Sequence, residues 1–207
     1  MGASSVYGVG AENGWADLVK TYLHTKMYGP SSIGERYEIF NFSKSGSTIE
    51  FIASNFDWIY RNYHRPDAEL VILISVGGND AKAEGRPDNF VCSPEDFRKK
   101  IVSLIQSLQE HATQIAFVGN GFVDDTKTNP KASPFDGGKS YFTNERRSLF
   151  NSITKEVCED NGIRFIVANV EQSYWIKNCH YDDGLHPNQK GYEEVFKALK
   201  PTIDSYL

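Results

Sequence analysis

The sequence has few cysteines and no long apolar run. Its three cysteines, Cys92, Cys158 and Cys179, are widely spaced and form no CxxC pair, so they indicate neither a disulfide framework nor a structural zinc site. The longest apolar run, residues 70–76, is far shorter than the roughly 18–20 residues that cross a bilayer. A basic stretch followed by an apolar one, as in a signal peptide, is also missing. We therefore expect a cytoplasmic protein with free thiols and no membrane insertion.

An excess of positive charge is absent as well. The 207 residues include 22 Lys and Arg against 27 Asp and Glu, which gives a formal net charge of −5. This balance disfavours nucleic acid or an anionic membrane as the main partner. The hydrophobic fraction of 40% and the charged fraction of 24% are typical of a globular domain. Because no repeat or linker interrupts residues 1–207, we expect a single domain.

Helical and extended patterns alternate along the chain. Apolar residues at helical spacing predict helices, and short alternating or continuous apolar runs predict strands. The expected helices are residues 14–27, 48–63, 94–111, 143–161 and 188–206, and the expected strands are residues 37–42, 69–76, 114–118 and 163–168. A long polar loop is expected over residues 120–141. This alternation predicts a parallel sheet with helices on both faces.

The alternation is incomplete at the N-terminus. A βα unit begins with a strand, yet Gly2 directly follows Met1. Either the strand that precedes Gly2 lies outside this sequence, or another segment replaces it. In a sheet of this type that strand is central, so its absence removes backbone hydrogen bonds and apolar contacts.

The segments that follow the predicted strands carry the chemistry, because ligands of open parallel sheets bind outside the carboxyl ends of the strands. These segments are residues 2–8, 43–47, 76–80, 120–124 and 182–187. A serine hydroxyl needs a base such as histidine to accept its proton, and a carboxylate orients that histidine. The oxyanion of acyl transfer needs preorganised N–H donors. Together the segments contain all of these groups.

Four of the segments resemble the sequence blocks of the SGNH hydrolases, also called GDSL-like lipases and acylhydrolases. Ser4 in GASSVYG matches the nucleophile of the GDSxxxG block, and Gly46 resembles the glycine of the second block. Asn79 in GGND matches the asparagine of the GxND block. Asp183 and His186 in DGLH match the DxxH block. The blocks occur in the order of the family, and the resemblance covers nearly the whole chain.

The resemblance implies a flavodoxin-like α/β/α sandwich with strand order 2-1-3-4-5. It implies a serine esterase that cleaves a small acyl ester through an acyl-serine intermediate, without cofactor or metal. In this hypothesis Ser4 attacks, His186 transfers the proton and Asp183 orients His186. The oxyanion hole comprises the N–H groups of Ser4 and Gly46 and the side-chain amide of Asn79. The sequence selects neither one substrate among carboxylesters, thioesters, lysophospholipids and sugar esters, nor an oligomeric state.

One position departs from the pattern of the family, because Ala3 stands where an aspartate usually precedes the nucleophile. The resemblance implies that this aspartate supports the nucleophile loop, so Ala3 predicts looser positioning of Ser4. A catalytically weakened SGNH-like binding protein is therefore an alternative hypothesis. Ser5 is the alternative nucleophile, and Asp182 is the alternative acid.

The long loop over residues 120–141 is a candidate for substrate specificity, since long connections often carry it. Tyr141, Phe142 and Trp175 are candidates for the lining of an acyl pocket. Asp80, next to the predicted oxyanion residue, is expected to accept hydrogen bonds from nearby backbone N–H groups.

A nucleotide-binding oxidoreductase is a further alternative. The glycine-rich GASSVYGVG resembles the dinucleotide turn of short-chain dehydrogenases, and Tyr22 and Lys26 fit the YxxxK pattern. This pair lies too close to the glycine turn for those enzymes. No acidic residue ends a second strand about 20 residues further on, where a ribose would be held. An α/β-hydrolase is disfavoured because the sequence has no GxSxG motif.

Overall fold

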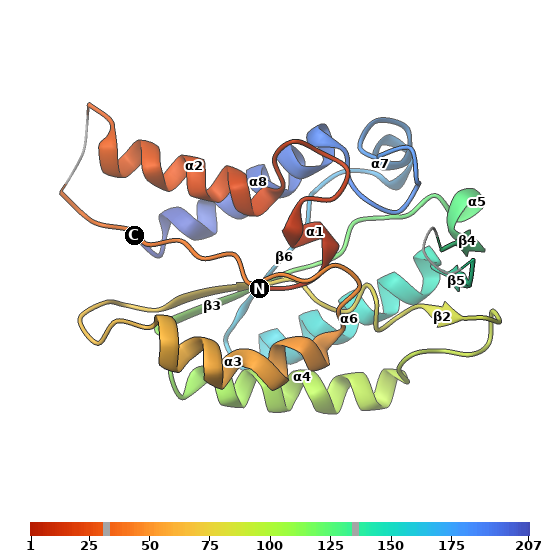
Figure 1. Ribbon diagram of the computed structural model, residues 1–207, viewed down its shortest axis with the longest axis horizontal. Helices are drawn as coiled ribbons and strands as arrows, with labels where there is room; N and C mark the ends of the chain where they lie inside the picture. Colours follow the sequence, from red (N-terminus) through yellow and green to blue (C-terminus); the bar gives the residue numbers. More distant parts are fainter. Residues whose placement is uncertain (31–33, 134–136) are drawn as a thin grey trace.

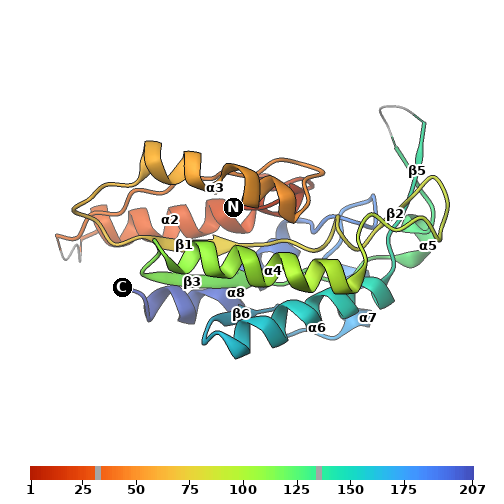
Figure 2. The same cartoon turned by 90° about the horizontal axis from the view of Figure 1, so that it is seen from below.

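The computed structural model describes residues 1–30, 34–133 and 137–207 (Figure 1). Its central parallel sheet has the order β1-β3-β6. The strands are β1 (Val71–Ile74), β3 (Gln114–Val118) and β6 (Arg164–Ile166). Two helices cover one face, namely α2 (Trp15–Tyr28) and α8 (Gln189–Asp204). Three cover the other, namely α3 (Ile49–Tyr63), α4 (Pro94–Gln109) and α6 (Asn144–Asp160) (Figure 2). The predicted three-layer fold is confirmed.

Each face of the sheet has its own hydrophobic core. The core under α3, α4 and α6 includes Ile52, Phe97 and Phe150, all of which are buried. The core under α2 and α8 includes Trp15 and Tyr192. This two-sided burial explains why the central strands have continuous apolar sequences. In the described parts of the chain, no helix is both long enough and apolar enough to cross a bilayer.

Local sequence signals explain where the long helices begin. Ser93 precedes α4, and its hydroxyl accepts a hydrogen bond from Asp96 N at 3.1 Å. Thr143 and Asn188 cap α6 and α8 in the same way. These side chains satisfy backbone N–H groups that have no partner within the helix. The predicted long helices are confirmed, with ends that differ by at most two residues.

Residues 120–141, predicted as one long polar loop, contain regular secondary structure, so that prediction is wrong. This segment contains the short helix α5 (Asp125–Thr128) and the strands β4 (Lys131–Ala132) and β5 (Lys139–Tyr141). With β2 (Ala83–Glu84), the two strands form a small antiparallel sheet. Helix α7 (Gln172–Asn178) was also not predicted. Strands of two or three residues are too short to show a hydrophobic period.

Met1 and Gly2 occupy the position of the expected central strand. Gly2 forms parallel bridges to both Ser43 and Ser75, so these segments and β1, β3 and β6 follow the expected order 2-1-3-4-5. The Met1 amino group donates to Leu73 O at 2.7 Å, and Ser75 N donates to Met1 O at 3.1 Å. The strand predicted over residues 37–42 is absent. A strand needs a hydrogen-bonding partner, and here the partner is limited to Met1 and Gly2.

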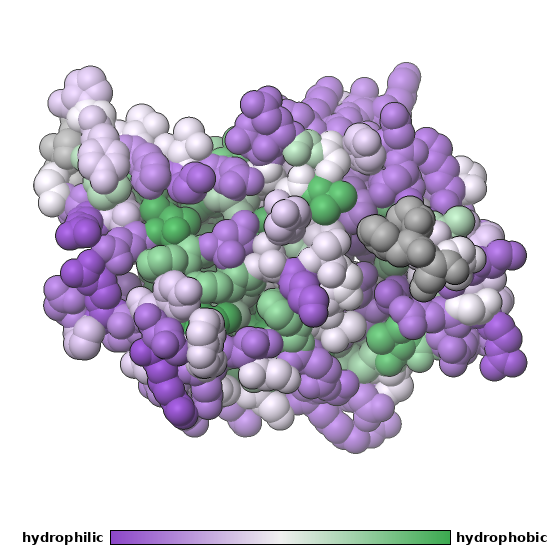
Figure 3. Space-filling model, in the orientation of Figure 1, coloured by the Kyte–Doolittle hydropathy of each residue, from purple (hydrophilic) through white to green (hydrophobic). Residues whose placement is uncertain are grey.

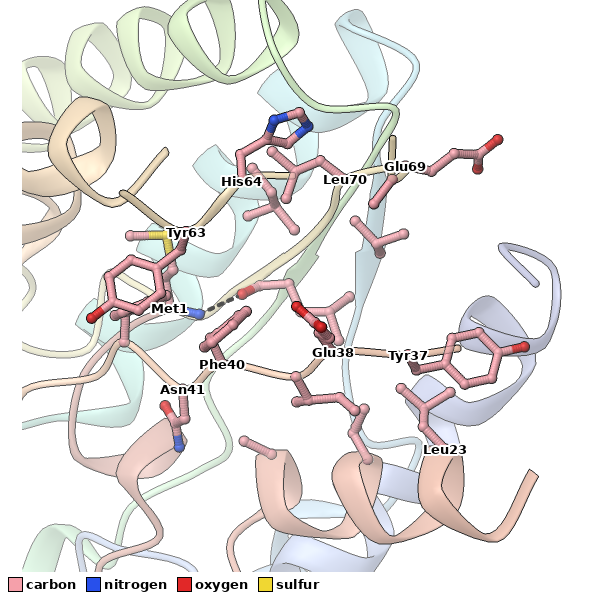
Figure 4. Close-up of a pocket in the computed structure, with 18 of the residues that line it drawn as sticks. Met1, Leu23, Tyr37, Glu38, Phe40, Asn41, Tyr63, His64, Glu69 and Leu70 are labelled. Atoms are coloured by element: carbon pink, nitrogen blue, oxygen red, sulfur yellow. Dashed lines mark hydrogen bonds between the residues drawn. The ribbon is translucent and has the colours of Figure 1, made fainter. Parts of the chain in front are cut away.

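An apolar groove continues from Met1 between residues 37–42 and β1 (Figure 4). Its volume is about 440 Å³, and Leu23, Phe40 and Leu70 are among its lining residues. Hydrophobic surface is visible in this region, between α2 and α3 (Figure 3). Burial in the groove lowers the pKa of the Met1 amino group to about 5. The groove therefore lies where the central strand would complete the sheet.

Candidate active site

The carboxyl end of the parallel sheet gathers the predicted site residues. The short helix α1 (Ser4–Tyr7) begins two residues after Gly2, which places Ser4 just above the sheet edge. Gly2 permits this approach, because a Cβ at this position would lie 2.4 Å from Ser75 O. Asn79 follows β1, and His186 lies before α8. The same end of the molecule also holds α5, α7 and the small antiparallel sheet (Figure 1).

Ser4, His186 and Asp183 form a continuous chain of contacts. The Ser4 Oγ lies 2.9 Å from His186 Nε2, and His186 Nδ1 lies 2.6 Å from Asp183 Oδ2. Since a carboxylate only accepts hydrogen bonds, Nδ1 carries the proton and Nε2 accepts from the serine hydroxyl. The alternatives Ser5 and Asp182 take no part in these contacts. This arrangement can move a proton from a hydroxyl to an imidazole.

The Asp183 carboxylate is held in its charged form. Its Oδ1 accepts hydrogen bonds from the backbone N–H groups of Leu185 and His186, each at 2.9 Å. Burial alone would raise the pKa of Asp183, but these bonds and the bond to the His186 ring hold that pKa well below its usual range. The carboxylate is thus ready to stabilise an imidazolium.

Lys131 forms an ion pair with Asp183 and was not predicted from the sequence. Its Nζ lies 3.3 Å from Asp183 Oδ2 and donates to Asp183 O at 3.1 Å. Lys131 lies on β4, 52 residues before Asp183. No local pattern marks a lysine that reaches its partner through a two-residue strand.

Of the candidate oxyanion residues, Ser4 and Asn79 line the same cavity, whereas Gly46 does not. Asn79 lines the cavity at Ser4, and its amide donates one hydrogen bond to Ser47 O at 2.9 Å, which leaves a second N–H. Ser47 lines the cavity, while its neighbour Gly46 is exposed. Asp80 accepts hydrogen bonds from Ile49 N and Gly77 N, which holds the loop that carries Asn79.

The cavity beside Ser4 is small. Its volume is about 40 Å³, roughly three water-sized positions. Phe142 and Trp175 line it, as expected, whereas Tyr141 is not among the lining residues. Trp175 is fixed by a hydrogen bond from its Nε1 to Phe122 O at 3.0 Å. The space accommodates a group of only a few non-hydrogen atoms.

Two further lining residues were missed from the sequence, Asn120 and Arg147. Asn120 follows β3, and its amide donates to Val76 O at 2.7 Å. It lies in the segment after β3 that is expected to contribute to the site, but Asn120 itself was not predicted to line the cavity. Arg147 lies in the first turn of α6. In the sequence, a charged residue there cannot be distinguished from an ordinary solvent-exposed residue of a helix.

Ala3 is the N-cap residue of α1 and provides no side-chain hydrogen bond to the helix. An aspartate at an N-cap accepts hydrogen bonds from the first backbone N–H groups of a helix. The first turn of α1, which carries Ser4, therefore lacks this support.

The dehydrogenase-like pair lies away from this site. Tyr22 and Lys26 are on α2 and both contact Asp204 at the end of α8. The separation between Lys26 Nζ and Asp204 Oδ1 is 3.3 Å. These contacts join two helices on one face of the sheet, so the pair has a structural explanation.

Comparison with known proteins gives one family and several similar structures. The model of the GDSL-like lipase/acylhydrolase family matches residues 1–199. No curated protein matches the chain. A lipase/acylhydrolase from Enterococcus faecalis has 17% identity and a TM-score of 0.70, with 100% of this chain and 94% of that chain covered.

Two esterases are also similar in structure. The psychrotrophic esterase EstA from Pseudoalteromonas sp. has 17% identity and a TM-score of 0.66, with 100% of this chain and 95% of that chain covered. A catalytic mutant of an acetylxylan esterase from Geobacillus stearothermophilus has 15% identity and a TM-score of 0.66, with 98% and 91% covered. At these identities, the structural similarity supports the fold.

Proposed function

Because the chain belongs to the GDSL-like lipase/acylhydrolase family, we propose that it is a serine esterase that hydrolyses small acyl esters through an acyl-serine intermediate. The observation that carries this proposal is the chain of contacts from Ser4 Oγ through the His186 ring to Asp183. A hydroxyl, an imidazole and a charged carboxylate in this order are the groups that nucleophilic acyl transfer requires.

In the proposed reaction, Ser4 Oγ attacks the ester carbonyl while its proton moves to His186 Nε2. The imidazolium is stabilised by Asp183, which remains ionised. Collapse of the tetrahedral intermediate releases the alcohol, which takes the proton from His186. Water then attacks the acyl-serine with His186 as base, and the acid leaves.

The oxyanion is proposed to be bound by three N–H donors, the backbone groups of Ser4 and Gly46 and the amide of Asn79. Ser4 is the first residue of α1, so its N–H has no acceptor within the helix. One such donor contributes about 3–4 kcal/mol to transition-state stabilisation. The hydrogen bond from Asn79 to Ser47 O fixes the amide before substrate binds.

A short acyl group fits the cavity best, because about 40 Å³ is available beside Ser4. The structural similarity to an acetylxylan esterase is consistent with a small acyl group. We expect p-nitrophenyl acetate to be hydrolysed with a higher kcat/KM than the butyrate and octanoate esters.

Removal of the nucleophile or base tests the proposal. Ser4→Ala and His186→Ala are each expected to lower kcat for p-nitrophenyl acetate by a factor on the order of 10⁶. Ser5→Ala is the matched control, since Ser5 does not contact His186, and it is expected to retain most of the activity. Wild-type turnover in Ser4→Ala would show that another group attacks.

The binding-protein alternative rests on Ala3, which leaves α1 without a side-chain cap. It predicts that the wild-type protein binds esters but does not turn them over. Measurable hydrolysis that depends on Ser4 excludes it.

A further inference from the structure

Arg147 lines the same small cavity as Ser4 and His186. It also lies close to Gly78, because its Nη2 is 3.1 Å from the position that a Cβ on Gly78 would take. Gly78 immediately precedes Asn79, so the guanidinium borders the side of the cavity that holds the proposed oxyanion donor.

The Arg147 guanidinium lacks the partners that a buried charge normally has. Its Nε is buried and has no hydrogen-bond partner among the described residues. No carboxylate in the described parts of the chain lies within ion-pair distance of it. Burial lowers the pKa of Arg147 to about 10, which still leaves it protonated at neutral pH.

The neighbouring arginine on α6 shows the contrast. Arg146 donates to Ala81 O at 3.1 Å and to Cys92 O at 2.8 Å, and its guanidinium stacks on Phe90 at 3.8 Å. Those contacts account for Arg146 as a structural residue. Arg147 lines the cavity and has no comparable hydrogen bond among the described residues, although the ring of His180, whose buried Nδ1 also has no partner, is near enough to interact with it electrostatically.

A desolvated charge without a partner destabilises a protein, and replacing it by an apolar group of similar volume is often neutral or stabilising. An anion in the cavity would supply the missing acceptor, since the planar guanidinium binds a carboxylate through two parallel hydrogen bonds. The net charge of −5 gives the protein no general attraction for anions, so this attraction is local to Arg147.

We propose that Arg147 forms an anion subsite of the active site and that the preferred substrate is an ester with a carboxylate a few bonds from the scissile carbonyl. This inference rests on the proposed esterase function. The short separation follows from the small volume of the cavity that Arg147 shares with Ser4. A half-ester of a short dicarboxylic acid has this chemistry, and so does the acyl ester of a short hydroxy acid.

Matched pairs of charged and neutral esters test the subsite. One pair is mono-p-nitrophenyl succinate and its methyl ester, with the carboxylate on the acyl side. The other is O-acetylglycolate and its methyl ester, with the carboxylate on the alcohol side. In one of the pairs, the wild-type kcat/KM is expected to be at least tenfold higher for the charged ester.

Arg147→Met is expected to reduce that charged-to-neutral ratio to about one, and Arg147→Lys to retain part of it. Arg164→Met is the matched control, because Arg164 is an exposed arginine on β6 outside the cavity, and it should keep the wild-type ratio. A wild-type ratio near one for both pairs, or an unchanged ratio in Arg147→Met, would overturn the inference.

Binding without turnover separates this inference from the proposed function. The Ser4→Ala protein is expected to bind monomethyl succinate in calorimetry, and the Ser4→Ala, Arg147→Met protein to bind it at least tenfold more weakly. If no ester is hydrolysed but this difference is found, the esterase proposal fails and the subsite stands. If neutral esters are hydrolysed through Ser4 but neither variant binds the anion, the subsite alone fails.

Arg147→Met is also expected to raise the thermal midpoint, because it removes an unpaired charge from a partly buried position. A folded, more stable protein that has lost charge selectivity would show that Arg147 serves binding. A variant that unfolds would instead assign Arg147 a structural role, and this outcome contradicts the inference.

Discussion

Two cavities of this protein differ in volume by about tenfold, and the proposed active site lies at the smaller one. The groove beside β1 has a volume of about 440 Å³ and is lined largely by apolar and aromatic side chains. The cavity at Ser4 has a volume of about 40 Å³, and polar groups from six separate segments line it, namely Ser4, Ser47, Asn79, Asn120, Arg147 and His186. The convergence of groups with complementary chemistry favours the smaller cavity as the active site, although the groove has the larger volume.

The two regions also differ in the hydrogen-bond partners of their backbone N–H and C=O groups. At the carboxyl end of the sheet, Asp80 and Asp183 accept backbone N–H groups and hold the loops in place. Beside β1, Met1 pairs with Leu73 and Ser75, and the groove begins directly beyond it. Changes at the first region should therefore affect turnover, and changes at the second should affect stability.

After the loss of Ser4 or His186, the largest effect on turnover is expected from the loss of the acid. Asp183→Asn is expected to lower kcat by a factor on the order of 10⁴, because the amide no longer holds the His186 tautomer. Asp182→Asn is the control, since Asp182 is exposed and does not contact the His186 ring, and its effect should be within a few fold. Equal losses of kcat in the two variants would show that the assignment of Asp183 as the acid is wrong. Steady-state kinetics with p-nitrophenyl acetate measures both.

The smallest expected effect lies at the junction of the two regions, where Ala3 connects Gly2 to α1. Ala3→Asp supplies an N-cap side chain and is expected to stabilise the protein by about 1 kcal/mol. It should also raise kcat modestly, because it restrains the turn that carries Ser4. Ala3→Val, whose side chain is close to aspartate in size but offers no capping oxygen, is the control. Thermal unfolding and kinetics of the two variants test this, and equal stability would show that α1 needs no cap.

Much of the site was predictable because its signals are local. Asp183 and His186 lie three residues apart, Asn79 follows a strand that the apolar pattern marks, and Ser4 lies in the short glycine-flanked segment GASSVYG. Arg147 and Lys131 were not predictable, because each reaches the site through a helix or a two-residue strand that has no motif.

The fold shows the same division. The strands over residues 69–76 and 114–118 are buried on both faces, so their apolar runs were sufficient to predict them. The strand over residues 37–42 was predicted wrongly. Its own alternation favours a strand, but most of these residues have no neighbouring strand to pair with, because the groove lies between them and β1. Strand formation depends on a neighbour that the local sequence does not describe.

Covalent labelling tests the central claim most directly. A p-nitrophenyl alkylphosphonate ester reacts with an activated serine, and mass spectrometry of the digested protein identifies the labelled residue. The account predicts one phosphonate per chain, on Ser4, with labelling abolished in His186→Ala. Labelling of Ser5, or equal labelling of Ser4 without His186, would contradict it.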